Sequence, residues 1–67
     1  MLPIDERDAK WIRILRIDLG CTHARIGELW EMRFGQTFGA CAGDSGRQLC
    51  TWAAGLLGED ADSTEWN

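Results

Sequence analysis

The chain has 67 residues and a formal net charge of −4, from 7 basic and 11 acidic side chains. This length allows one small domain and excludes a two-domain enzyme, a barrel or a doubly wound sheet. The acidic balance argues against a sequence-independent nucleic-acid binder, because such proteins are normally basic. The chain shows no signal-peptide pattern, and no apolar run approaches the ~20 residues of a membrane span. We therefore expect a cytoplasmic protein that does not enter a membrane.

The first predicted element is a helix over residues 5–19, which contain neither proline nor glycine. Acidic residues stand at its start, where the helix dipole favours them, and Gly20 suits its end. At 100° per residue one apolar stripe forms. The residues of this stripe are Trp11, Ile12, Leu15 and Leu19. Ile14 and Ile17 fall outside it, among basic residues.

The second predicted helix spans residues 23–34, because Thr22 is a good N-cap and the apolar residues recur at helical spacing. Gly27 weakens a helix, and we expect that it serves close packing against the first helix. A glycine-rich loop over residues 35–46 follows. Phe38 is expected to anchor this loop on the core.

The third predicted helix runs over residues 46–57, with Ser45 as its cap and Gly58 as its stop. The last nine positions, residues 59–67, form an acidic tail. Trp66 is the exception in this polar tail, and we expect it to dock on the helices.

Together these elements predict an all-α fold, a compact three-helix bundle. The three-helix domain would comprise residues 1–58, and residues 59–67 would form the tail. Eight side chains are expected to fill the core: Trp11, Leu15, Ile26, Trp30, Phe34, Leu49, Ala53 and Leu56.

The chain offers no convincing catalytic set or metal site, so we expect a non-enzymatic protein without cofactor. Residues 41–46 (CAGDSG) resemble the motif around the nucleophile of trypsin-like serine proteases, but the chain is too short for that enzyme's two barrels. Four potential zinc ligands lack the usual close pair of cysteines. We expect separate buried thiols, with a zinc site and a disulfide as the alternatives. These four residues are Cys21, His23, Cys41 and Cys50.

Residues 15–30 (LRIDLGCTHARIGELW) resemble the opening of a helix-turn-helix domain, with Leu-Gly at a helix end and a capping threonine. The layout is also similar to small helical proteins of phages and actinobacteria that end in Trp-Asn. The resemblance implies a dimeric DNA-binding regulator. Arg47 and Gln48, at the start of the third helix, would read bases, and Arg25 would contact a phosphate.

The residues themselves favour another function, a small regulatory module that binds a protein partner. Four tryptophans in so short a chain and a mixed apolar and basic helix face fit a protein interface, where Trp and Arg dominate binding energy. Such a module would suit a phage or mobile-element inhibitor of a host system, and it would allow a homodimer. An acidic nucleic-acid mimic is a third hypothesis. The predicted partner-binding residues are Arg13, Ile14, Arg16 and Ile17.

Overall fold

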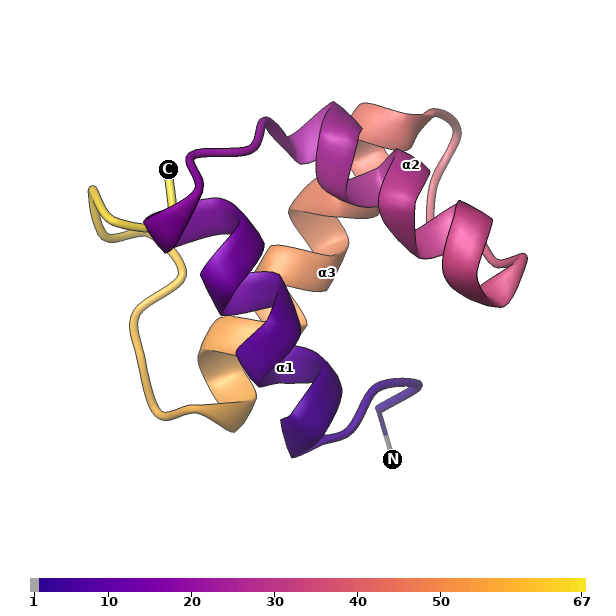
Figure 1. Cartoon of the computed structure of the whole chain (residues 1–67). Helices are drawn as coiled ribbons and strands as arrows, with labels where there is room; N and C mark the ends of the chain where they lie inside the picture. Colours follow the sequence, from indigo (N-terminus) through magenta and orange to yellow (C-terminus); the bar gives the residue numbers. More distant parts are fainter. Residues whose placement is uncertain (1) are drawn as a thin grey trace.

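The chain folds into a succession of helices, shown in Figure 1. The computed structural model describes residues 2–67, and within that range the backbone forms no strand. The helices, in chain order, are α1 (Glu6–Arg13), the π-helix η1 (Ile14–Asp18), α2 (His23–Phe34) and α3 (Ala42–Leu56). Helix α3 packs against both α1 and α2. The predicted all-α three-helix bundle is therefore confirmed.

The first helical run begins with a reciprocal cap. The backbone N–H of Asp8 donates to Oδ1 of Asp5 at 2.9 Å, and the backbone N–H of Asp5 donates to Oδ2 of Asp8 at 3.3 Å. Each carboxylate thus satisfies an N–H that the start of a helix leaves free. This cap fixes the start of α1 at Glu6, close to the predicted residue 5.

The end of the first helical run departs from the α-helical pattern. In η1 the N–H of Leu19 donates to the carbonyl of Ile14 at 3.0 Å, a bond that spans five residues instead of four. Each residue of a π-helix therefore turns through less than 100°, and positions beyond Ile14 leave their predicted faces. Leu19, predicted on the apolar stripe, is 67% exposed and lies outside the core. Ile17, predicted outside the stripe, is half-buried against the core.

Two glycines allow α2 and α3 to approach closely. A methyl group on Gly27 would overlap the carbonyl of Ala42, and one on Gly46 would overlap the carbonyl of His23. Close packing at Gly27 is confirmed, but its neighbour is α3. The prediction that it faces the first helix was wrong.

Helix α3 starts earlier than predicted, at Ala42 rather than Gly46. The glycine-rich loop is correspondingly short, residues 35–41. Ser45 is not the cap, because it lies inside the helix, and its buried hydroxyl oxygen accepts the backbone N–H of Phe38 at 3.0 Å. Phe38 is half-buried against the core, so its predicted anchoring role is confirmed.

Most of the predicted core is confirmed, with errors at helix ends. Trp11 is only half-buried. Phe34 and Leu56 are exposed, and their assignment to the core was wrong, because each is the last residue of its helix and extends beyond the packed turns. The buried apolar residues are Ile4, Ala9, Ile12, Leu15, Ile26, Trp30, Leu49, Cys50, Ala53, Ala54 and Trp66. Within residues 2–67, no helix combines the length and apolar character that crossing a membrane requires.

Candidate functional site

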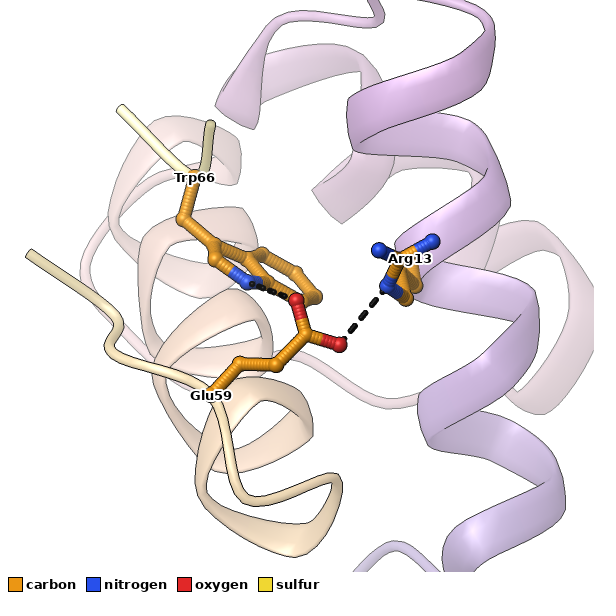
Figure 2. Close-up of polar contacts among 3 residues, drawn as sticks. All are labelled: Arg13, Glu59 and Trp66. Atoms are coloured by element: carbon orange, nitrogen blue, oxygen red, sulfur yellow. Dashed lines mark hydrogen bonds and ion pairs between the residues drawn. The ribbon is translucent and has the colours of Figure 1, made fainter. Parts of the chain in front are cut away.

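The acidic tail is fastened to the first helical run by a polar cluster that sequence reasoning missed, shown in Figure 2. Nε of Arg13 donates to Oε2 of Glu59 at 2.7 Å, and the indole Nε1 of Trp66 donates to Oε1 of the same carboxylate at 3.2 Å. Arg16 adds two bonds, from Nε to the carbonyl of Trp66 at 2.9 Å and from Nη1 to the carbonyl of Cys21 at 2.7 Å. The cluster holds the Trp66 ring in the core and confirms its predicted docking.

The charge state of Glu59 depends on this cluster. The hydrogen bond from Arg13 lowers the pKa of the Glu59 carboxyl, and the bond from Trp66 acts in the same direction. Reciprocally, the hydrogen bond to Glu59 raises the pKa of Arg13. Both groups are held in their charged forms, so their ion pair attaches the tail to the first helix.

The four residues predicted to form one partner-binding face have different environments in the structure. Arg13 and Arg16 hold the tail, and Ile17 packs against the core. Ile14 is 47% exposed and remains available to a partner. Both arginines of the predicted face are thus engaged within the fold, and Ile14 is the more exposed of its two isoleucines.

The residues predicted to contact DNA are partly engaged elsewhere. Arg25 pairs with Glu28 across one helical turn, with 3.5 Å between Nη1 and Oε2. Because α3 begins early, Arg47 and Gln48 lie in its second turn, and their predicted place at its start is wrong. Arg47 is exposed and Gln48 is half-buried. The first turn instead carries the exposed carboxylate of Asp44, a charge that repels phosphate.

The four candidate zinc ligands are not brought together. Within residues 2–67, no three His, Cys, Asp or Glu side chains gather in a way that would hold a metal ion. All three cysteines are free thiols, so the disulfide alternative is wrong. Cys50 is buried and burial raises its pKa to about 11, whereas Cys41 is exposed and the expectation of a buried thiol there is wrong. Burial also lowers the pKa of His23, and the nearby arginines add to that effect.

An exposed aromatic and arginine cluster lies where α1 meets the C-terminal end of α2. The guanidinium carbon of Arg33 stands 4.9 Å from the ring centre of Trp11 and 5.4 Å from that of Phe34. Beneath them, the Trp30 ring lies 4.2 Å from Phe34 and 6.3 Å from Trp11, centre to centre. The cluster thus consists of an arginine held over two rings, which in turn pack on a core tryptophan.

The neighbouring side chains extend the cluster along the first helix. Arg7, Trp11 and Ile14 follow one another at spacings of four and three residues, which places them on one face of the helix. We call this region the Trp11–Arg33 surface. It comprises Arg7, Trp11, Ile14, Arg33 and Phe34.

The two cations of the Trp11–Arg33 surface are free of acidic partners. The ion pairs that form among residues 2–67 involve Lys10, Arg13 and Arg25, and include neither Arg7 nor Arg33. Over the same range the molecule has no pocket. The surface therefore offers partly exposed aromatic rings and guanidinium groups that form no ion pair within residues 2–67.

Comparison with known proteins gives no relative. No family model, curated protein or solved structure matches this chain. The resemblance to helix-turn-helix domains therefore stays a prediction. Function must be argued from the surfaces of the fold itself.

The sequence contained one signal for the Trp11–Arg33 surface. Arg7, Trp11 and Ile14 stand at helical spacing on the side away from Ile12. Helical periodicity alone divides this row, because it assigns Trp11 to the apolar stripe and leaves Arg7 on the basic side of the helix. The contribution of α2 was hidden for a similar reason, since Phe34 fitted the apolar stripe of its helix.

Proposed function

We propose that this protein is a small non-enzymatic module that binds a protein partner through the Trp11–Arg33 surface. The observation that carries the proposal is the placement of Arg33 over the rings of Trp11 and Phe34, with no ion-pair partner among residues 2–67. Aromatic residues, Met and Arg are the types enriched at protein interfaces. An arginine already held against rings loses little conformational freedom when it binds, which favours affinity.

The exposed apolar groups of the surface support the same proposal. Phe34 and Ile14 are 42% and 47% exposed. Large apolar side chains beside arginine fit the mixed composition of a protein interface. The regulatory role expected from the sequence, such as inhibition of a host system by a phage or mobile element, suits a module whose binding surface is carried by two helices.

The test is affinity capture from a lysate of the encoding organism, after nuclease treatment, with matched variants as bait. The surface variant is Ile14→Ser/Arg33→Ser, and the control is Leu56→Ser/Arg47→Ser, which removes an exposed apolar residue and an exposed arginine from α3. Both should keep the helical circular dichroism spectrum. We expect proteins retained by the wild type and the control to be lost with the surface variant.

The alternative, a helix-turn-helix DNA-binding regulator, predicts the opposite pattern. Capture would then depend on nucleic acid and vanish with nuclease. The control variant would lose binding because it lacks Arg47, and affinity for a labelled duplex would fall steeply with salt. Equal loss in both variants, or capture that requires DNA, would refute the protein-binding proposal.

A further inference from the structure

We infer that the Trp11–Arg33 surface binds an acidic segment of the partner protein, with an apolar side chain on the Trp11 and Phe34 rings and carboxylates on Arg7 and Arg33. The inference rests on the proposed function and adds the chemistry of the partner. The local charge supports it, because that charge is opposite in sign to the charge of the chain as a whole.

The charge of the Trp11–Arg33 surface is basic although the chain carries a net charge of −4. The carboxylates nearest in sequence are directed elsewhere. Asp8 accepts the N-cap hydrogen bond, and Glu6 forms its ion pair with a lysine one turn along α1. Glu31 precedes Arg33 by two residues, so it lies on the opposite side of α2. Arg7 and Arg33 are thus left as local cations for an external carboxylate.

The geometry at Arg33 favours a carboxylate in particular. Its guanidinium carbon lies within 5.4 Å of two ring centres. Aromatic rings hold a guanidinium by its face and leave its N–H groups directed to the edge. Those N–H groups match the two oxygens of a carboxylate, and the pairing strengthens where rings exclude water from one side. An apolar side chain beside that carboxylate would cover the exposed parts of Trp11 and Phe34.

The position of the acidic tail explains why a short acidic segment is accepted despite the net charge. Figure 1 shows the tail, residues 59–67, at the opposite side of the molecule from the C-terminal end of α2. Charges beyond about 8–10 Å are largely screened at physiological ionic strength. The acidic tail therefore adds little repulsion to a short acidic segment on the surface, and Arg7 and Arg33 are the cations that attract it. A nucleic-acid strand would extend past the two cations and gain little from them, so we favour the acidic peptide.

The first test is selection of displayed random peptides on the immobilised wild-type protein, with counter-selection on Arg33→Glu. We expect enriched peptides to combine Asp or Glu with an aromatic or large aliphatic residue. Peptides that bind the surface without any excess of acidic residues would overturn this inference and leave the proposed function standing. Enrichment of no peptide that depends on Arg33 would overturn both.

The second test measures a selected peptide by calorimetry against charge-reversed variants. Arg7→Glu and Arg33→Glu should each weaken binding about tenfold or more. Arg47→Glu makes the same change of charge at an exposed residue of α3 and should leave affinity within about twofold. A peptide with its acidic residues changed to lysine should bind Arg33→Glu better than the wild type. Equal losses at Arg47 and Arg33 would show a general effect of charge and overturn the assignment.

Two further measurements address the other occupants of the surface. Sedimentation of the wild type should show no self-association that Arg33→Glu abolishes. If it does, the occupant is a second copy of the chain, and the inference of a separate acidic partner fails. A labelled single-stranded oligonucleotide should not compete with the peptide, and competition lost in Arg33→Glu would assign the surface to nucleic acid.

Discussion

Removal of the Trp66 indole should cost the protein about half or more of its stability. Trp66 is 1% exposed, and its Nε1 donates to Glu59 at 3.2 Å. A buried indole covers roughly 200 Å², which at ~25 cal/mol/Å² corresponds to about 5 kcal/mol. Trp→Ala substitutions in cores cost about 3–5 kcal/mol. The expected stability of a domain of 67 residues is about 3–10 kcal/mol. Trp66→Ala should therefore leave a marginal fold.

The assay is urea unfolding followed by far-ultraviolet circular dichroism, because three other tryptophans complicate fluorescence. Trp66→Ala should lower the midpoint strongly, by the equivalent of about 3–5 kcal/mol. Trp66→Phe keeps an aromatic ring and loses the N–H donor, so its loss should be smaller. Deletion of the exposed Asn67 serves as the control for shortening the tail. A loss below about 1 kcal/mol for Trp66→Ala would refute the view that the tail completes the core.

Three further predictions concern packing, pH and thiol reactivity. Gly46→Ala should destabilise the protein by about 1–3 kcal/mol or more, because the added methyl group would overlap the backbone at His23. Gly55→Ala, in the same helix but with open space around it, should stabilise the protein by about 0.5–1 kcal/mol. Thermal unfolding of the two variants tests this difference. The pKa of Glu59 is lowered in the folded protein, so the stability that its charge supplies is present above the ordinary pKa of 4.5 and is lost as pH falls through the lowered pKa. Glu59→Gln should therefore reduce the loss of stability at acid pH, as thermal melts at several pH values would show. Iodoacetamide at neutral pH should alkylate the exposed Cys41 well before the buried Cys50, whose pKa is about 11, as peptide mass spectrometry would show.

The helices could be predicted from local chemistry where caps and periodicity agree. Thr22 accepts the N–H of Arg25 at 3.1 Å, as expected of an N-cap. The start of α3 could not be found in this way, because residues around Gly43 and Gly46 have low helix propensity. Gly46 occurs inside the helix because only a glycine fits against His23. At Gly46, packing against α2 overrides the low helix propensity of glycine. The contact that decides the conformation is therefore made by a residue of another helix and cannot be found from the local sequence.

The role of the basic residues on the first helix could not be predicted from the sequence. Arg13 bonds to a residue 46 positions away and Arg16 to one 50 positions away. Helical spacing shows only that both lie away from the apolar stripe. A solvent-facing arginine and one that fastens a distant segment have the same local pattern. The same limit applies to Arg33, whose second ring belongs to the first helix.

Most of the tryptophans in this chain serve the core and not a binding surface. Trp30 and Trp66 are each 1% exposed, and Trp52 is half-buried against Phe38 with ring centres 5.0 Å apart. In a core of this size, large rings bury the most apolar area per residue. Burying Trp30 also costs free energy, because its Nε1 has no hydrogen-bond partner within residues 2–67. Abundance of tryptophan therefore reflects the needs of a small core. Trp11 is instead half-buried beneath an arginine that forms no ion pair within residues 2–67, and the proposed binding surface is centred on that ring for this reason.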